Sequence, residues 1–549
     1  MEVKLTDCYT LSDGKALMSG TEALVRLLLE QSRIDRMNGL RTKGLVSGYP
    51  GSPLGGLDIA LGKAKSFLDE EGIYFQPAVN EELAATALWG SQHINLYDNP
   101  SVQGVFSMWY GKGPGLDRAM DALRHANQGG VAPHGGMVIA VGDDPTGKSS
   151  TLAYQSDQNF HSLGIPYFFP KNVSEIIPMG LEAFALSRYS GCCVGLKIVV
   201  DTADSNAVVD MSRLRPNFPK MKPNKLVHVT KHDPAGARES KLHEIRLPEV
   251  QKWCAKSENA VQIYLPVKKG KTRLGIIGVG KIANEINEAL ITLLPDGGKS
   301  NTVAFTALNM PWPLPEQSLS DMLSIAEEVL VIEEKRSFVE DQIAKICVKK
   351  DRNMLLSGKT NPDGENLLPS YGELSLENII NVIAERASHH SIELNPLKEL
   401  SLVKKLDEIP VRQPYYCAGC PHNSSTKASD GEIVGMGIGC HSISGFINPD
   451  TITNFTQMGG EGAFWIGRAP FSERSHSFQN MGDGTYAHSG YLGVRAAVAA
   501  GVNITFKMLV NDAVAMTGGQ SAQGGSSPFS MAQQLLAEGV KKVVIVSDQ

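Results

Sequence analysis

Short apolar runs rich in β-branched residues alternate along this chain with segments whose apolar residues recur every three or four positions. Runs of the first kind predict strands, and segments of the second kind predict helices. Residues 20–31 show the helical spacing clearly, with Leu24, Leu27 and Leu28 on one face. Strands are predicted at 43–47, 105–108, 137–141, 195–200, 303–307, 329–333 and 504–510. Because strands that alternate with helices build parallel sheets covered by helices, the pattern predicts an α/β protein.

Breaks in this pattern divide the chain into three predicted domains. Two of them are doubly wound parallel-sheet domains, and a smaller α/β domain lies between them in the sequence. Polar and proline- or glycine-rich stretches predict the boundaries. The predicted order is a first domain at 1–215, a connector at 216–260, the smaller domain at 261–392, a linker at 393–413 and the last domain at 414–549.

Composition narrows the classes of function. Of the 549 residues, 42% are hydrophobic and 20% are charged, as expected for an enzyme with large buried cores. The net charge of −6 argues against nucleic acid as a partner. No apolar run reaches the length of a membrane span and the first residues do not resemble a signal peptide, so we expect a cytoplasmic protein that does not bind membranes.

The end of the chain continues the α/β pattern. A helix is predicted at 531–539 and a further strand at 541–547, and nothing after this strand would cap the sheet. We therefore expect the chain to be a fragment of a longer polypeptide, or to be completed by a partner.

The segment 481–520 carries the most specific chemistry. It opens with Gly482-Asp483-Gly484, continues through a predicted helix and strand, and reaches Asn511. The glycines allow a phosphate group to approach the backbone closely. Asp483 and Asn511 each offer a hard oxygen, the ligand type that magnesium prefers when it also binds a diphosphate. The segment predicts a magnesium–diphosphate site; a tight turn before a buried helix is the structural alternative.

This pattern resembles the signature of thiamine diphosphate enzymes, and residues 515–520 are similar to the 2-oxoacid:ferredoxin oxidoreductases in particular. The resemblance implies that Asp483 and Asn511 bind Mg²⁺ through their side chains and Ala513 through its carbonyl oxygen. It also implies a thiamine diphosphate-binding fold, with a middle domain similar to the C-terminal domain of transketolase. The turns that would cradle the cofactor contain Gly460, Glu461, Gly462, Gly482 and Gly484.

Two segments of the first predicted domain match the same family. The turn 49–53 resembles one that contacts the 2-oxoacid, with Ser52 where threonine is usual. Residues 79–85 resemble a segment whose glutamate acts on the aminopyrimidine of the cofactor and so promotes deprotonation of its thiazolium carbon. The match assigns this role to Glu81, and Glu82 points about 100° away on a helix. A proline-braced turn and acidic residues at a helix start are the structural alternatives.

Cys417, Cys420 and Cys440 cluster in a glycine-rich region, unlike the other cysteines of the chain. Such thiolates suit an iron–sulfur cluster, or zinc with His422 or His441 as a further ligand; free thiols are the third alternative. The segments resemble the CPGCPH-like and GxGC motifs of indolepyruvate and related 2-oxoacid:ferredoxin oxidoreductases. The resemblance implies a [4Fe–4S] cluster whose fourth cysteine lies beyond residue 549.

Two other motifs match nucleotide-binding expressions. Residues 142–149 fit the P-loop, but two aspartates and a proline stand where backbone amides would hold phosphate. Residues 278–283 fit a dinucleotide fingerprint, but no acidic residue ends a clear second strand about twenty residues later. We interpret the first as the ADDP-like segment of the resembled family and the second as a strand-to-helix turn.

Family motifs occur in all three predicted domains. They imply the alpha-type portion of an indolepyruvate:ferredoxin oxidoreductase, which converts a 2-oxoacid, coenzyme A and oxidised ferredoxin into an acyl-CoA, carbon dioxide and reduced ferredoxin. A gamma- or beta-type subunit or a fused C-terminal domain would complete it, and we expect a homo-oligomer. A non-redox thiamine diphosphate decarboxylase or synthase is the alternative, and an inactive or regulatory fragment is a third. The sequence leaves the identity of the 2-oxoacid open.

Overall fold

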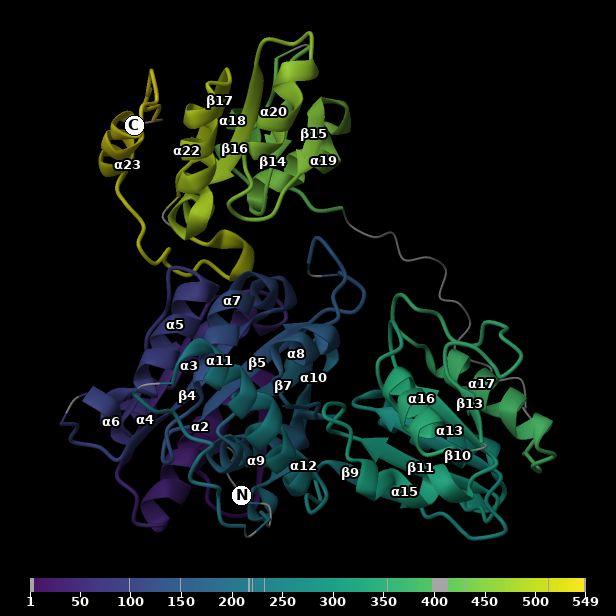
Figure 1. The fold of residues 1–549 in the computed structure, drawn as a ribbon. Coiled ribbons are helices and arrows are strands. Elements are labelled where there is room, and N and C mark those ends of the chain that lie inside the picture. The colour runs from purple at the N-terminus through teal and green to yellow at the C-terminus, as the bar shows by residue number, and fades with distance from the viewer. Residues whose placement is uncertain are drawn as a thin grey trace. The chain divides into compact units, whose positions relative to one another are not determined.

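The computed structural model describes residues 4–547 except 98, 149, 216, 217, 220, 232, 353, 397–412, 430 and 512. The chain divides into two compact units, whose elements are labelled in Figure 1. The first unit contains Met1–Pro77 and Glu81–Leu400, and the second contains Ala78–Asn80 and Ser401–Gln549. The linker predicted at 393–413 lies almost wholly outside the described residues, and the predicted domain boundaries stay predictions.

A six-stranded sheet forms the centre of the first unit. Its strand order is β3-β2-β4-β5-β7-β6, and every neighbouring pair runs parallel. From β2 the chain proceeds outward to β3, and it then returns to place β4 on the other side of β2. The sheet is therefore doubly wound, with its switch point between β2 and β4. The strands are β2 (Thr42–Gly48), β3 (Ile73–Phe75), β4 (Gly104–Lys112), β5 (Met137–Asp143), β6 (Tyr167–Phe168) and β7 (Val194–Val199).

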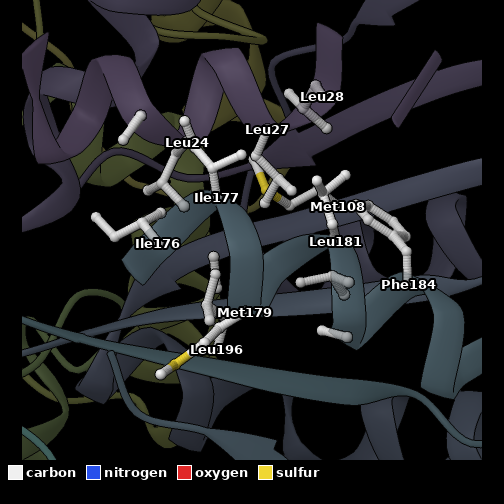
Figure 2. Packing of buried hydrophobic residues seen from close by; sticks show 14 of the residues in the cluster. Leu24, Leu27, Leu28, Met108, Ile176, Ile177, Met179, Leu181, Phe184 and Leu196 are labelled. Carbon is white, nitrogen blue, oxygen red and sulfur yellow. The ribbon is translucent and has the colours of Figure 1, made fainter. Parts of the chain in front are cut away.

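Helices α2 (Gly20–Met37) and α9 (Val173–Ser190) pack against each other and against this sheet. Helix α2 begins at Gly20 because Ser19 and Glu22 form a capping box. Figure 2 shows leucines of α2 and apolar residues of α9 meeting in one buried cluster with Met108 and Leu196 of the sheet. The other helices here are α1 (Asp7–Thr10), α3 (Leu57–Lys63), α4 (Lys65–Glu70), α5 (Glu81–Ser91), α6 (Ile94–Tyr97), α7 (Gly113–Gly129), α8 (Asp157–Leu163) and α10 (Val200–Asp204).

The predicted connector is folded onto this sheet domain. Its helices are α11 (Ala235–Ser240), the π-helical turn η3 (Lys241–Arg246) and α12 (Leu247–Cys254). Arg246 is fully buried and donates to the carbonyls of Val227, Asn127, Gln128 and Gly129. These hydrogen bonds offset the free-energy cost of burying the guanidinium and hold the connector against the sheet domain. Strands β1 (Lys15–Ser19) and β8 (Asn206–Asp210) form a separate antiparallel pair.

A second sheet in the first unit has five strands in the order β13-β12-β10-β11-β9. Only β9 is antiparallel to its neighbour. Buried Glu328 at the start of β12 accepts hydrogen bonds from Arg386 of α17 at 2.7 and 2.9 Å, which ties that helix to the sheet. The strands are β9 (Val261–Leu265), β10 (Leu274–Val279), β11 (Val303–Leu308), β12 (Glu328–Ile332) and β13 (Leu355–Ser357). The helices are α13 (Ile282–Leu293), α14 (Pro295–Gly298), α15 (Glu316–Ile325), α16 (Val339–Lys349) and α17 (Leu376–His389).

The second unit is built on a parallel sheet in the order β15-β14-β16-β17. Met481 of β16, Val494 and Leu535 belong to a small buried cluster on one face of the sheet. The strands are β14 (Val434–Met436), β15 (Ile452–Phe455), β16 (Ser477–Gly482) and β17 (Ile504–Leu509). The helices are α18 (His422–Ser425), α19 (Ser444–Ile447), α20 (Ala463–Arg468), α21 (Asp483–Thr485), the π-helical turn η7 (Tyr486–Gly490), α22 (Tyr491–Ala500) and α23 (Pro528–Ala537).

The three sheets, mainly parallel and covered by helices, confirm the predicted α/β fold class. One predicted strand is wrong: residues 541–547 form no strand. A strand needs a hydrogen-bonding neighbour, and β17 pairs only with β16 among the described residues. Within the described part of the chain, no helix combines the length and the apolar character that a bilayer span requires.

Candidate active site

The Gly482-Asp483-Gly484 motif lies where two neighbouring parallel strands end. In the β16–β17 pair, Gly482 is in register with Leu509, so Asp483 and Asn511 follow their strands at the same edge of the sheet. The amide N of Asn511 donates to Asp483 Oδ2 at 2.9 Å, and Gly484 N donates to Oδ1 at 2.8 Å. Backbone donors from both strand ends therefore hold the carboxylate in place.

The groups at this edge fit a magnesium-bound diphosphate. Asp483 is buried, whereas Asn511 is exposed and its Oδ1 accepts a hydrogen bond from Ala513 N at 3.2 Å. A Cβ atom at Gly482 would meet no heavy atom within 4 Å, so the space over this glycine is open to a ligand. A carboxylate, an amide oxygen and an open glycine backbone are the features that such a ligand requires. The role of the Ala513 carbonyl stays a prediction.

The glycine-rich turn at 459–462 packs beside the helix that follows the motif. Glu461 is fully buried and accepts from Gly459 N at 2.7 Å through Oε2. A Cβ at Gly493 of α22 would lie 2.4 Å from the Glu461 carbonyl oxygen, so helix and turn are in direct backbone contact. Gly462 N donates to Gln479 Oε1 of β16 at 3.0 Å. The turn is thereby fixed to both the strand and the helix that flank Asp483.

The three clustered cysteines lie in the same unit. Cys417 is exposed, and Cys420 and Cys440 are half-buried. Burial raises the pKa of Cys440, and the negative charges of Cys420 and Cys417 raise it further, which shows that the three sulfurs interact electrostatically. Their donor chemistry fits an iron–sulfur cluster. Among the residues that the structure describes, however, no three His, Cys, Asp or Glu side chains stand close enough together to hold a metal ion.

The neighbouring histidines differ in what they offer. His441 is buried, and its Nε2 accepts a hydrogen bond from Gly437 N at 3.1 Å. Burial lowers the pKa of His441 to about 4, so the ring is neutral and this nitrogen is occupied, which disfavours it as a zinc ligand. Burial also lowers the pKa of His422, while the charge of Asp483 raises it. The cysteine segment therefore adjoins the diphosphate motif.

In the first unit, the turn 49–53 lies at the carboxyl edge of the six-stranded sheet. Tyr49 N donates to the carbonyl of Tyr110 in β4 at 3.2 Å. The turn also packs on β5, since a Cβ at Gly142 would lie 2.9 Å from Pro53 Cδ. Ser52 is half-buried within the turn. This edge is the switch point between β2 and β4, the place where doubly wound sheets bind ligands.

Glu81 and Glu82 occupy different environments at the start of α5. Glu81 is only 5% exposed, and its carbonyl accepts from Trp109 Nε1 of β4 at 3.0 Å. Its carboxylate lies against the start of α7, where a Cβ at Gly115 would come within 2.9 Å of Oε1. Glu82 is 45% exposed in its side chain and faces Arg118 at 3.8 Å. The burial of Glu81 supports it over Glu82 for a role that needs a sheltered carboxyl group.

The P-loop-like segment does not have P-loop geometry. Asp144 Oδ1 accepts from the amides of Thr146 and Gly147 at 3.3 and 2.8 Å, and these are amides that would otherwise bind phosphate. The next helix, α8, begins only at Asp157, and the side chain of Lys148 is 75% exposed. Ser149, the last residue of the P-loop expression, lies outside the described residues. The segment is a loop held by its own aspartate.

The dinucleotide-like turn is closed by packing. A Cβ at Gly280 would lie 2.1 Å from the ring of Phe169, which therefore fills the space over the turn. Lys281 forms ion pairs with Glu373 and with Asp201, and lies 3.8 Å from Glu334. No room is left for a pyrophosphate, and the turn simply joins β10 to α13.

Two features of the first edge were missed by sequence reasoning. Lys197 of β7 is buried and pairs with Asp157 at 2.7 Å and Asp143 at 3.5 Å, beneath the ADDP-like segment. Lys112 ends β4 beside the turn 49–53. A lysine at the end of an apolar strand, in the run Gly111-Lys112-Gly113, was the available signal for the second.

Known proteins are similar in sequence to this chain over almost its full length. Residues 266–409 match the family model described as the indolepyruvate oxidoreductase domain. The indolepyruvate oxidoreductase subunit IorA of Pyrococcus abyssi is 26% identical over 99% of this chain and 82% of its own length. The IorA subunit of Methanothermobacter marburgensis is 26% identical over 95% of this chain and 79% of its own length. Over almost all of its length, the chain is therefore similar to the IorA subunits of indolepyruvate oxidoreductases. The resemblance seen in the motifs is confirmed by these matches.

Solved structures give a weaker likeness. A 2-oxoglutarate:ferredoxin oxidoreductase from Magnetococcus marinus, solved with 2-oxoglutarate, coenzyme A and succinyl-CoA, matches with a TM-score of 0.49 and 16% identity. The match covers 68% of this chain and 65% of that one. An inactive split-gene transketolase tetramer matches with a TM-score of 0.42 and 12% identity over 68% of this chain and 98% of that one.

Proposed function

We propose that this chain is the thiamine diphosphate-binding subunit of an enzyme that oxidatively decarboxylates a 2-oxoacid to an acyl-CoA. The observation that carries the proposal is the Asp483–Asn511 pair, joined by a hydrogen bond at the ends of two parallel strands beside an open glycine. Similarity to indolepyruvate oxidoreductase subunits supports an aryl 2-oxoacid such as indolepyruvate as the substrate.

In this proposal Asp483 and Asn511 bind Mg²⁺ through side-chain oxygens, and the carbonyl of Ala513 supplies a third oxygen. The turn of Gly460, Glu461 and Gly462 supports the same site from the side. Glu81 holds a proton on the aminopyrimidine ring, and its 5% exposure shelters that proton from water. When bound, thiamine diphosphate supplies the electron sink that decarboxylation of a 2-oxoacid requires. Ser52 orients the substrate with its hydroxyl group.

In this proposal Cys417, Cys420 and Cys440, together with one further ligand, would hold a [4Fe–4S] cluster, and ferredoxin is the electron acceptor. A cluster supplies the one-electron steps that a two-electron oxidation to an acyl-CoA needs when ferredoxin is the acceptor. Thr485, next to the Gly482-Asp483-Gly484 motif, donates to the carbonyl of Ile438 at 3.0 Å, which supports a cluster close to the diphosphate site. The relatives are named as a subunit, which supports a second subunit as partner.

The test uses the purified protein, with any co-purifying subunit, under anaerobic conditions. Binding of Mg-thiamine diphosphate is measured first. Reduction of a viologen dye is then measured in the presence of indolepyruvate and coenzyme A. We expect Asp483→Asn to weaken cofactor binding by more than about 100-fold, because it removes a direct metal ligand. Asp450→Asn, an exposed aspartate of the same unit, is the matched control.

Each outcome of the assay decides between functions. Dye reduction with acyl-CoA formation supports the redox reaction. Carbon dioxide release with an aldehyde product and no dye reduction would move the function to a non-redox decarboxylase. A wild-type protein that fails to bind Mg-thiamine diphosphate would overturn the proposal, and so would normal binding by Asp483→Asn.

A further inference from the structure

We propose that Lys112 binds the carboxylate group of the 2-oxoacid substrate, as the cation that the switch point of the six-stranded sheet presents to an anion. The inference rests on the proposed function, because it names the residue that would recognise the acid group of that substrate. The lysine comes from a different segment than either Ser52 or Glu81.

The topology brings Lys112 to the switch point. Lys112 is the last residue of β4 and is in register with Gly142 of β5. Two residues earlier in β4, Tyr110 is in register with Gly48 at the end of β2. The turn 49–53 leaves β2 at the same level. Lys112 therefore lies between the ends of two parallel strands, at the position where doubly wound sheets bind their ligands.

The stem of the lysine lies on the turn that carries Ser52. A Cβ added to Gly51 would lie 2.9 Å from both Cγ and Cδ of Lys112, so the side chain crosses the turn in contact with its backbone. Any residue larger than glycine at position 51 would displace this stem. The stem of Lys112 is thus packed against the turn that contains Ser52.

The charge of Glu81 also acts on Lys112. Burial lowers the pKa of Lys112, and the negative charge of Glu81 raises it, so the two groups interact electrostatically. Gly115 at the start of α7 contacts the Glu81 carboxylate and keeps it beside the end of β4. Lys112 therefore contacts the turn that carries the residue proposed to orient the substrate, and its charge interacts with the residue proposed to act on the cofactor.

Glu81 acts on the Lys112 amine only at longer range than an ion pair. Among the described residues, Lys112 makes no hydrogen bond and no ion pair within 4.0 Å, although it is half-buried. The nearby Lys197 differs, because Asp157 and Asp143 already neutralise it. A partly buried ammonium without an ion pair favours binding an anion. The carboxylate of a 2-oxoacid also needs such a cation, because Glu81 would otherwise repel it.

The experiment compares a 2-oxoacid with its methyl ester, which keeps the carbonyl group and loses the charge. Binding of indolepyruvate and of its ester is measured by calorimetry on the holoenzyme without coenzyme A or acceptor, and turnover is measured alongside. Lys112→Met should weaken binding of the acid about 10- to 100-fold, the cost of losing one charge-assisted hydrogen bond, and leave binding of the ester within about twofold. Lys112→Arg should restore part of the affinity for the acid.

Lys148→Met is the control, because this lysine is exposed. Equal losses for acid and ester in Lys112→Met would overturn the inference and assign Lys112 a structural role. A loss confined to thiamine diphosphate affinity or to kcat would overturn it as well, and would indicate that Lys112 acts through Glu81. A wild type that binds the acid but does not oxidise it contradicts the proposed function alone, since the binding comparison still reports on Lys112. A wild type that binds no 2-oxoacid contradicts both.

Discussion

The first unit contains two mainly parallel sheets. Their carboxyl edges have similar backbone turns but different side chains. Each has a glycine-containing turn after a central strand and a helix that follows it, at 48–57 in the six-stranded sheet and at 278–282 in the five-stranded sheet. At the first edge, Glu81 is buried against a glycine, and Lys112 has no ion pair among the described residues. At the second edge, Phe169 fills the space over Gly280.

The charged side chains also differ between the two edges. Lys281 at the second edge is paired with Glu373 and Asp201. Buried Glu333 accepts hydrogen bonds from the amides of Phe338, Val339 and Glu340 at 2.9 to 3.1 Å, which cap the first turn of α16. Lys281 and Glu333 at the second edge therefore both have partners within the protein. The comparison teaches that the doubly wound topology offers a ligand site at every such edge, and that the side chains decide whether the site stays open.

The sharpest test of this contrast is Glu81→Gln. If the first edge is catalytic, removing a general acid–base group should lower kcat by about 10²- to 10⁴-fold while the affinity for Mg-thiamine diphosphate changes little. The amide is nearly isosteric, so the packing against Gly115 is kept. Steady-state assays with indolepyruvate and calorimetric titration of the cofactor measure the two effects.

Glu82→Gln is the matched control for that substitution. Its side chain is 45% exposed and faces Arg118 at 3.8 Å, so we expect kcat within about threefold of wild type, as for other exposed surface pairs. The reverse result, with a large loss in Glu82→Gln and none in Glu81→Gln, would exchange the assignments of the two glutamates.

The second edge is tested by the pH dependence of stability. Burial raises the pKa of Glu333 to about 7, although three backbone amides and Lys359 lower it. Between about pH 4.5 and 7 the folded protein keeps a proton that the unfolded chain has released, so the free energy of unfolding falls as pH rises across this window. The shift corresponds to about 3 kcal/mol. Glu333→Gln should abolish this part of the slope, as measured by urea unfolding at pH 5 and 7.

Glu377→Gln, an exposed glutamate of α17, should leave the slope unchanged. An unchanged slope in Glu333→Gln would show instead that Glu333 remains ionised in the fold and that its three amide donors outweigh its burial. The second edge would then hold a true buried charge, and its contrast with the first edge would be smaller than the structure indicates.

The parts of this molecule that the sequence predicted are those encoded by contiguous residues. The strand at 43–47 and the helix at 20–31 were both predicted, because an apolar pattern specifies each of them locally. The strand at 541–547 failed, because a strand also requires a neighbour that its own residues do not encode.

The site of the first unit was harder to predict because several separate segments assemble it. Lys112 had no motif, and its proximity to Gly51 and Glu81 depends on strand register and on the packing of α5 and α7. Conversely, the residues at 142–149 match a motif whose geometry the fold does not provide, because Asp144 takes up the amides of Thr146 and Gly147. A sequence motif predicts a binding site only where the fold allows the backbone conformation that the motif requires.

The smallest predicted effect concerns Lys148, the lysine that the P-loop expression would make essential. It follows β5 at the first edge, but its side chain is 75% exposed and lies 3.9 Å from Glu373. Such a surface ion pair contributes less than about 0.5 kcal/mol. Lys148→Ala should therefore change neither the free energy of unfolding by more than that amount nor the turnover of indolepyruvate by more than about twofold. Urea unfolding and the dye-reduction assay measure these values.

ATP hydrolysis by the wild type that disappears in Lys148→Ala would contradict the interpretation that residues 142–149 are no P-loop, and would indicate that the first edge binds a nucleotide. Lys148 would then be the lysine that binds an anion at this edge, although its side chain is largely exposed and Lys112 is half-buried.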